Sequence, residues 1–321
     1  MKRRHLVISA AAAASLHVPA WAAYPERPIT FVVPFPPGGP ADGYGRALAQ
    51  ALSEQVRQPV VVDNRSGAGG ALGVQTVARA AADGYTIGMA GTGATVFQPL
   101  LSEKALIDVF KETTMLSKMV RTPNFLVIGA GVKANSAAEL VALARARPGQ
   151  LTFASAGAGS GPHILGELFK QHANVDILHI PYKGAAPALQ DLMAGQVDMF
   201  FGEAPGVLSL IRGGKLRALF TTDTRRAKWL PDVPHAGEVG LAGVVAEGSY
   251  GVVAPPGLPA ETAATLRRAL NEALRSPKLA EAFDQRAGIP EPSTSEEYAA
   301  YLRSEQSRWL PVVRKANIRL E

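Results

Sequence analysis

Residues Val32–Arg46 read V-V-P-F-P-P-G-G-P-A-D-G-Y-G-R, and the rest of the chain can be organised around them. An apolar, β-prone run at Ile29–Val33 leads into a loop of prolines and glycines, and a helical pattern follows. Asp42 is predicted to cap this helix, because its short side chain can accept from first-turn amides. Gly43 and Gly45 each cost about 1 kcal/mol relative to alanine in a helix. They indicate either backbone amides that approach an anion or a tight turn without a ligand.

A second strand, small-residue loop and helix follow at Leu151–Phe169, which reads L-T-F-A-S-A-G-A-G-S-G-P-H-I-L-G-E-L-F. Pro162 suits the first helical position, and Ser160 or Gly161 suits the N-cap. The two loops lie roughly 120 residues apart. If each belongs to its own α/β domain, they can face each other across a cleft and clamp one anion between two positive helix ends.

Short β-prone runs alternate with helical patterns along the chain, which predicts an α/β protein with parallel sheets covered by helices. The last part of the chain reads as three helices, the third capped by Ser295. The expected strands are Ile29–Val33, Val60–Val62, Thr86–Met89, Phe125–Ile128, Leu151–Ala154, Ile177–Ile180, Val197–Phe201, Leu216–Thr221 and Tyr250–Ala254. The expected helices include Ala137–Ala146, Ile164–Gln171, Ala260–Ser276, Lys278–Ala287 and Ser295–Val313.

The N-terminus has the pattern of a secretory signal peptide. Lys2, Arg3 and Arg4 precede an apolar run at Leu6–Ala14, and a small-residue site follows at Ala20-Trp21-Ala22. This pattern predicts export with cleavage near Ala22-Ala23, so that residues 1–23 are removed. The arginine pair leaves both the general secretory route and the twin-arginine route open. In a Gram-negative host the mature protein would be periplasmic.

Charge and cysteine content exclude several classes of function. The chain of 321 residues carries a formal net charge of +6 at pH 7, which falls to +3 without residues 1–23. A balance of charges this even does not favour nucleic-acid binding, which needs a clustered basic footprint. The chain has no cysteine, so disulfides, thiolate nucleophiles and cysteine metal sites are excluded. A small anionic ligand remains compatible with this composition.

The glycine-rich stretch Asp63–Tyr85 does not predict a dinucleotide site. Gly67, Gly69 and Gly73 have the spacing G-x-G-x-x-x-G rather than G-x-G-x-x-G. An exported protein is also an improbable user of NAD. We therefore interpret the stretch as a glycine-rich turn before a helix, and no cofactor is predicted.

No local catalytic or metal motif is present. Ser160 lacks the G-x-S-x-G frame because Ala158 occupies the leading glycine position. The histidines that follow residue 23 show no zinc spacing. His163 falls in the first turn of an expected helix, where it would contact a ligand or fill space. The histidines considered are His163, His172, His179 and His235.

Several segments make the chain similar to the Bug/TctC family of extracytoplasmic solute receptors, which are associated with tripartite tricarboxylate transport. The similarity is collinear from about Tyr24 to the C-terminus. The segments that carry it are Tyr24–Asp42 (Y-P-E-R-P-I-T-F-V-V-P-F-P-P-G-G-P-A-D), Val61–Gly70 (V-V-D-N-R-S-G-A-G-G), Ala82–Thr86 (A-D-G-Y-T), Gly166–Phe169 (G-E-L-F), Ile180–Leu189 (I-P-Y-K-G-A-A-P-A-L), Gly195–Asp198 (G-Q-V-D), Gly213–Leu219 (G-G-K-L-R-A-L) and Leu230–Pro234 (L-P-D-V-P).

The resemblance implies a periplasmic-binding-protein fold of type II character, with two α/β domains and a ligand cleft between them. Its two crossing segments are expected near Arg121–Phe125 and Ala246–Tyr250. The first domain would then comprise residues 24–122 and 250–321, and the second residues 123–249.

The resemblance also implies where a small carboxylate would bind. Phe35 would form a wall of the site, Ala41 would donate an amide, and Asp42 would act through the helix cap. Two departures leave the ligand's identity open: Pro40-Ala41 replaces residues that often carry hydroxyls, and Gly202-Glu203 replaces an Asp-containing D-x-x-P pattern. Glu203 would accept from an amine or hydroxyl of the ligand, or be solvated. The expected ligand-binding residues are Phe35, Gly38, Gly39, Ala41, Asp42, Thr92, Gly157, Ser160, Gly161, His163 and Glu203.

The function implied is capture of a small carboxylate, without chemistry on it, by a monomer that closes around the ligand. The ligand classes left open are di- and tricarboxylates, aromatic carboxylates and acidic amino acids. The captured ligand would pass to the membrane permease subunits of a tripartite tricarboxylate transporter. An alternative is a receptor that reports to a sensor kinase. A secreted serine hydrolase using Ser160 or another serine is the alternative from the enzyme class.

Overall fold

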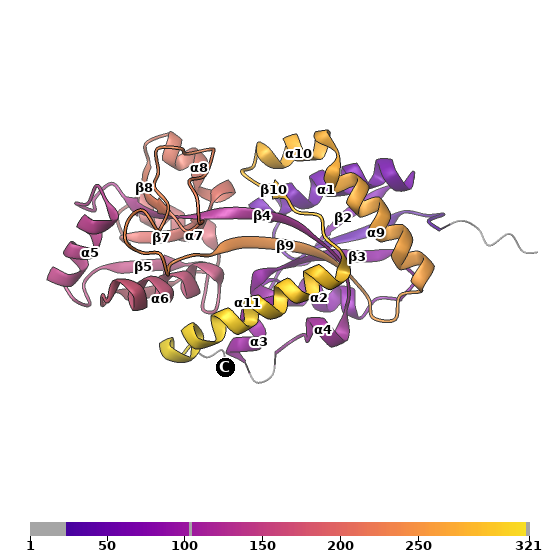
Figure 1. Cartoon of the computed structure of the whole chain (residues 1–321), viewed down its shortest axis with the longest axis horizontal. Helices are drawn as coiled ribbons and strands as arrows, with labels where there is room; N and C mark the ends of the chain where they lie inside the picture. Colours follow the sequence, from indigo (N-terminus) through magenta and orange to yellow (C-terminus); the bar gives the residue numbers. More distant parts are fainter. Residues whose placement is uncertain (1–23, 103–104, 319–321) are drawn as a thin grey trace, which may run out of the picture.

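The computed structural model describes residues 24–102 and 105–318. The predicted signal peptide, residues 1–23, therefore lies outside the described residues. In the described part of the chain, no helix is long and apolar enough to cross a membrane. Two halves are joined by two long strands, β4 and β9, and α11 runs alongside both halves (Figure 1).

A mixed sheet forms the centre of the protein, in the order β2-β1-β3-β9-β4-β7-β5-β6. Its first part contains β1, β2 and β3, which pair in parallel, and its second part contains β5, β6 and β7, which also pair in parallel. The strands are β1 (Ile29–Val33), β2 (Val60–Asn64), β3 (Thr86–Gly91), β4 (Thr114–Gly129), β5 (Thr152–Ser155), β6 (Leu178–Pro181), β7 (Met199–Glu203), β8 (Leu216–Thr221), β9 (Glu247–Ala254) and β10 (Ile289–Pro290).

Strands β4 and β9 make the sheet mixed, whereas the sequence predicted parallel sheets. Strand β9 pairs antiparallel with both β3 and β4. Strand β4 continues past β9 into the second half, where it pairs antiparallel with β7 and β8. The expected crossing segments Arg121–Phe125 and Ala246–Tyr250 lie at this passage. Short alternating runs do not distinguish strand directions, so the antiparallel pairs were missed.

The helices cover the sheet on both faces, and the first half is completed by the C-terminal helices α9, α10 and α11 (Figure 1). The helices are α1 (Pro40–Val56), α2 (Ala71–Ala78), α3 (Gln98–Leu101), α4 (Val109–Glu112), α5 (Ala137–Ala146), α6 (Gly161–Ala173), α7 (Ala185–Met193), α8 (Ala204–Arg212), α9 (Ala260–Arg275), α10 (Pro277–Asp284) and α11 (Ser295–Ala316), with short turns of other helix at η1 (Ala68–Gly70) and η2 (Gly93–Phe97).

Two predicted helix caps are wrong by one to three residues. Helix α1 begins at Pro40 with Gly39 as its N-cap, so Asp42 lies inside the first turn. Helix α11 is capped by Thr294 rather than Ser295. The Thr294 side chain accepts from the Glu297 amide, and the Glu297 side chain accepts from the Thr294 amide. This reciprocal pair is a capping box.

Close packing explains the two glycines in the first turns of α1. A methyl group at Gly45 would lie 2.5 Å from Val33 Cγ2 on β1, and one at Gly43 would lie 2.7 Å from Arg286 Nε. Both distances are too short for a β-carbon. Helix α1 can thus lie close to β1 and to the segment after α10, and the cost of glycine needs no anion to explain it.

A network of buried charges surrounds the place where β4 and β9 cross between the halves. Lys118 contacts Glu247 and Glu291. Arg121 contacts Asp223 at 3.1 Å, Glu247 at 3.9 Å and Glu291 at 2.7 Å. The side chains of Lys118 and Arg121 are only 10% and 9% exposed. Asp223 follows β8 in the second half, so the network ties both halves to the crossing.

Helix α11 forms a second bridge between the halves. Near its C-terminal end, Gln171 on α6 donates to the carbonyl of Val312 at 3.0 Å. Arg308 donates to the carbonyl of Val245 at 2.8 Å. On the first half, the ring of Trp309 packs edge-on against Phe97. The two halves are therefore connected on one side by α11 as well as by the crossing strands.

Loss of Arg121 should destabilise the fold strongly. Arg121→Met leaves carboxylates near a buried crossing without their main cation, which should lower the free energy of unfolding by about 3 kcal/mol. Arg27→Met is the control: Arg27 pairs with Asp83 in solvent, so its loss should cost less than about 1 kcal/mol. Urea denaturation measures both. Equal losses would contradict the structural role of the network.

Candidate functional site

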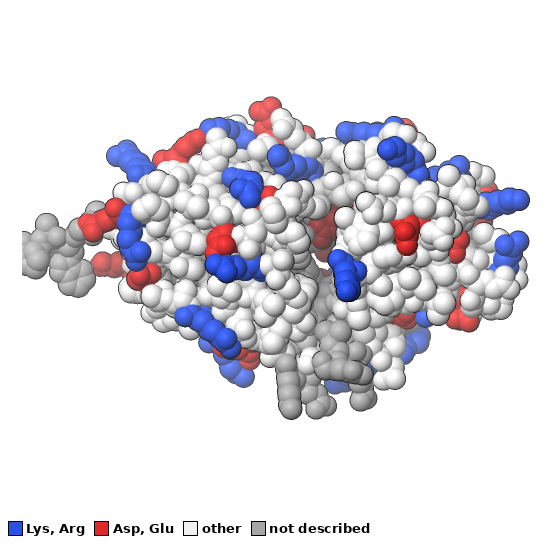
Figure 2. All heavy atoms as spheres, turned by 180° about the vertical axis from the view of Figure 1, so that it is seen from behind, with Lys and Arg blue, Asp and Glu red and all other residues white. Residues whose placement is uncertain are grey.

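A furrow runs between the two halves of the molecular surface, as Figure 2 shows from behind. Charged side chains on this face are scattered and of both signs. The C-terminal ends of β1 and β3 lead into it from one half, and those of β5 and β7 from the other. Helices α1, α6 and α8 begin directly after β1, β5 and β7. Helix N-termini carry free amides and partial positive charge, so this arrangement suits an anion.

The two halves approach each other closely at these helix starts. A methyl group at Gly206 in the first turn of α8 would lie 3.9 Å from Pro40 Cγ at the start of α1. A methyl group at Gly161, the first residue of α6, would lie 3.9 Å from Phe97 Cε2. The start of each predicted helix thus lies against the opposite half.

Asp42 fixes the first loop instead of capping α1. Its buried carboxylate accepts from the Gly38 amide at 2.9 Å, from Arg46 Nε at 2.8 Å and from Asn64 Nδ2 at 2.9 Å. Burial alone would raise the pKa of Asp42, but the hydrogen bonds from Arg46, Gly38 and Asn64 outweigh it and lower the pKa. The charge of Asp42 is therefore already compensated, and the Gly38 amide is occupied by its hydrogen bond to Asp42.

Phe35 and Thr92 both contact strand β9. The Phe35 ring meets the Tyr250 ring edge-on, with centroids 6.0 Å apart. Thr92 Oγ1 donates to the carbonyl of Ser249 at 3.1 Å, beside Tyr250 on β9. Gly91 permits the close approach of the Tyr250 ring, because a methyl group at Gly91 would lie 3.0 Å from that ring. Tyr250 itself was not among the predicted site residues.

The second loop is held by its own hydrogen bonds. Ser160 is the N-cap of α6, but its hydroxyl donates to the carbonyl of Gly157 at 2.6 Å. The Gly157 amide donates to Ser155 Oγ at 3.1 Å, and Gly157 has a φ of +124° that glycine adopts readily. Pro162 lies at the second helical position and offers no amide. The first-turn amides of Gly161 and His163 have no intrahelical acceptor.

His163 stabilises this loop through a stacked pair of imidazoles. Its Nδ1 accepts from the Gly159 amide at 3.0 Å, and its ring lies 3.7 Å from that of His179 with 6° between the planes. His179 Nε2 is 2.6 Å from Ser155 Oγ. The two histidines are 16 residues apart and lie on different elements, so no local spacing could predict the pair.

Glu203 is half-buried and hydrogen-bonded. It ends β7 and is the N-cap of α8, and its Oε2 accepts from the Tyr250 hydroxyl at 2.9 Å. Burial raises the pKa of this carboxyl. A methyl group at Gly248 would lie 2.9 Å from Glu203 Oε1, so only glycine on β9 admits this approach. Glu203 and Tyr250 thus join the second half to the first at the base of the cleft.

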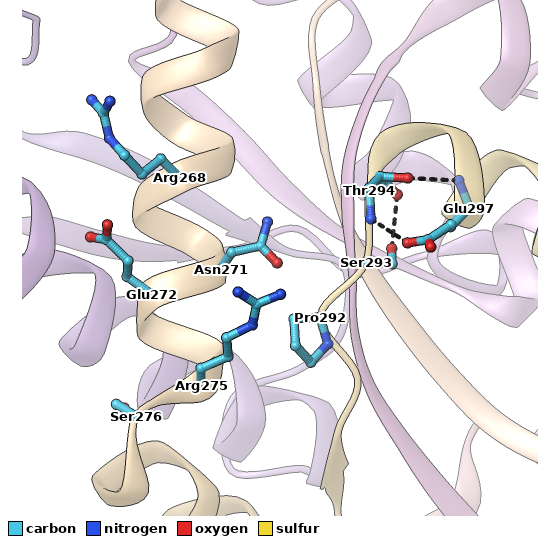
Figure 3. Close-up of a pocket in the computed structure, with 9 residues that line it drawn as sticks. All are labelled: Arg268, Asn271, Glu272, Arg275, Ser276, Pro292, Ser293, Thr294 and Glu297. Carbon is cyan, nitrogen blue, oxygen red and sulfur yellow. Dashed lines mark hydrogen bonds between the residues drawn. The ribbon is translucent and has the colours of Figure 1, made fainter.

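A separate hollow lies on the outside of the first half. It has a volume of about 720 Å³ and lies between α9 and the start of α11. Figure 3 shows Arg275 and Asn271 directed from α9 towards Pro292, with the capping box of Thr294 and Glu297 opposite. None of the predicted site residues lines it. Its open shape and mixed charges do not resemble an enclosed ligand site.

The described residues contain no group of three or more His, Asp or Glu side chains that could hold a metal ion.

Acid should weaken the fold through the stacked histidines. Burial, and for His179 also the neighbouring His163, lowers both pKa values from 6.5 to about 4, with a further contribution from Lys170. Between pH 6.5 and 4 the unfolded chain therefore binds protons that the folded chain does not. The free energy of unfolding should then fall as pH is lowered through this range.

Urea denaturation across this pH range measures the effect. A double variant, His163→Asn with His179→Gln, retains polar partners for Gly159 and Ser155 but cannot titrate. Its stability should depend less steeply on pH than that of the wild type. Identical slopes would show that the pair does not titrate as inferred.

Comparison with known proteins shows the family of the chain. Residues 45–318 match the model of the tripartite tricarboxylate transporter family receptor, TctC. BugT of Bordetella pertussis is 38% identical over 299 residues, 93% of this chain and 92% of BugT. An R. palustris protein solved with adipate has a TM-score of 0.87 and 32% identity, covering 92% of this chain and 99% of that one.

MatC from Rhodopseudomonas palustris, solved with bound malate, has a TM-score of 0.82 and 30% identity, covering 90% of this chain and 100% of MatC. These relatives are solute-binding proteins with a two-domain fold, not enzymes. The expected fold class and the non-enzymatic assignment are therefore confirmed. The chain belongs to the TctC family of periplasmic solute-binding receptors.

Proposed function

We propose that the protein binds one small carboxylate between its two domains, closes around it, and delivers it to the permease subunits of a tripartite tricarboxylate-type transporter. One observation carries the proposal: the starts of α1 and α6, which each follow a parallel strand, both lie against the opposite half, α1 against α8 and α6 against η2. Two helix N-termini can hold a carboxylate without an arginine. The relatives solved with adipate and malate support this ligand class.

In this proposal six of the predicted residues have a defined task. The amides of Ala41 and Gly161 donate to the carboxylate, and Phe35 and Thr92 bound the cleft. Asp42 and His163 act indirectly, since their polar atoms hold the two loops in place. The domains comprise residues 24–122 with 250–321, and residues 123–249. The mature protein acts as a periplasmic monomer after removal of residues 1–23.

Closure follows from the geometry of the two helix starts. Each domain contributes only part of the donors, so a carboxylate gains its full set of hydrogen bonds only in the closed form. A ligand that binds the closed form more tightly shifts the population towards it. The permease would then recognise the ligand-bound protein by its closed shape. If the protein serves signalling, a sensor kinase would recognise that shape instead.

The ligand can be identified by thermal denaturation of refolded mature protein, because refolding removes a ligand that copurifies. Mono-, di- and tricarboxylates, aromatic acids and acidic amino acids are each added in excess. A ligand at 100 times its Kd stabilises the fold by about 2.7 kcal/mol, which raises Tm measurably. No rise with any acid would overturn the carboxylate proposal. Loss of ligand uptake in cells without the gene would favour transport over sensing.

Added bulk at the two helix starts should block binding without unfolding the protein. Gly39→Val and Gly161→Val each place a side chain where the nearest neighbours lie at 3.6 and 3.9 Å, so the fold has room for them. Each should weaken carboxylate binding at least tenfold, about 1.4 kcal/mol, by isothermal titration. Gly131→Val, at an exposed glycine with no neighbour within 4 Å, is the matched control. Normal binding by both cleft variants would exclude the two-loop clamp.

A further inference from the structure

Glu203 occupies a built position at the base of the cleft. It lies between the end of β7 and the start of α8, and its carboxylate accepts from the Tyr250 hydroxyl at 2.9 Å. The absence of a side chain at Gly248 makes this approach possible. These features fix the carboxyl in place instead of leaving it to move in solvent.

Tyr250 connects Glu203 to the cleft wall. Its ring meets Phe35 edge-on and lies against Gly91, next to Thr92. On the other side of Glu203, the first turn of α8 approaches Pro40 of α1. Glu203 therefore lies between the wall formed by Phe35 and Tyr250 and the helix starts that face each other across the cleft.

No cation compensates Glu203 among the ion pairs of the described residues. Asp42, the buried acid of the first loop, is paired with Arg46. Lys118 and Arg121 near the crossing are paired with Glu247, Glu291 and Asp223. Burial raises the pKa of Glu203, which means that its surroundings already disfavour one negative charge.

The Tyr250 hydroxyl reinforces this polarity. Because its proton is donated to Glu203, its oxygen can only accept from a ligand. The base of the cleft thus offers acceptors, whereas the helix starts offer donors. A ligand that spans both would have an anionic end and an end that donates hydrogen bonds.

We propose that the Glu203 carboxyl, held in position by Tyr250, determines which carboxylate the protein takes: one whose far end is a hydroxyl, amide or ammonium group rather than a second carboxylate. The inference rests on the proposed function, because it concerns the far end of the same ligand. A second carboxylate near Glu203 would meet an uncompensated like charge and no donor. This preference separates the protein from its relatives solved with adipate and malate, whose ligands carry two carboxylates.

The test compares matched acids that differ only at the far end: succinate with succinamate, adipate with adipamate, suberate with suberamate, and terephthalate with its monoamide. Isothermal titration with refolded mature protein gives both dissociation constants of each pair. The wild type should bind the monoamide of its best-fitting pair at least tenfold more tightly than the diacid.

Two variants separate charge from position. Glu203→Gln removes the charge and keeps the shape, so it should reduce the preference for the monoamide at least tenfold. Tyr250→Phe removes the hydrogen bond and keeps the charge, so it should retain the preference. Glu272→Gln, at an exposed acid on α9, is the matched control and should leave the ratio unchanged.

The outcomes are distinguishable. If the wild type binds diacids as tightly as monoamides, or if Glu203→Gln leaves the ratio unchanged, the inference is overturned while the carboxylate receptor stands. If the wild type binds no member of any pair and no other carboxylate, the proposed function fails and the inference fails with it.

Discussion

Strand β4 is the element on which the rest of the structure depends. From Thr114 to Pro123 it pairs with β9, and from Asn124 to Gly129 it pairs with β7 and β8. One continuous backbone therefore belongs to the sheets of both halves. Because the parallel strands on either side end at the same furrow, the helices that follow them begin opposite one another. The cleft is a consequence of this shared strand rather than of contacts between preformed lobes.

The charges around the crossing restrict how the two halves can be arranged. Buried cations need partners, and Lys118 and Arg121 obtain theirs from three separate segments. Asp223 follows β8, Glu247 begins β9 and Glu291 follows β10. An ion network of this kind is sensitive to the relative placement of its members, so it stabilises particular arrangements of the halves. Hydrophobic side chains at the same positions would pack without such a dependence on direction.

Much of the fold could be predicted because its core strands are apolar and short. Ile29–Val33 and Leu216–Thr221 were predicted to the residue. The first half of β4 was missed because polar side chains such as Ser117, Lys118 and Arg121 interrupt its apolar pattern. Lys118 and Arg121 are buried only because distant carboxylates pair with them, and Ser117 Oγ accepts from the distant Ser293 amide. Periodicity within a window cannot reveal partners that lie more than a hundred residues away.

The site shows the same limit. The two loops were predicted from their glycines and prolines, but the roles of individual side chains depend on tertiary partners. Asp42 was expected to be a cap, yet Asn64 on the neighbouring strand and Arg46 one turn later hold it. Tyr250 reads as an ordinary strand residue, and only its contact with Glu203 gives it a place in the cleft.

The two helix starts that face the cleft are electrostatically unequal. Helix α1 carries Asp42 in its first turn, whereas the first turn of α6 has no acidic residue. A carboxylate in the first turn of a helix interacts favourably with the dipole and offsets part of its positive end. Although Arg46 compensates Asp42, α6 offers the stronger attraction for an anion in an open cleft. Helix α1 adds amides of fixed direction once the halves are close. The half that contains α6 therefore attracts the anion, and the half that contains α1 selects it by geometry.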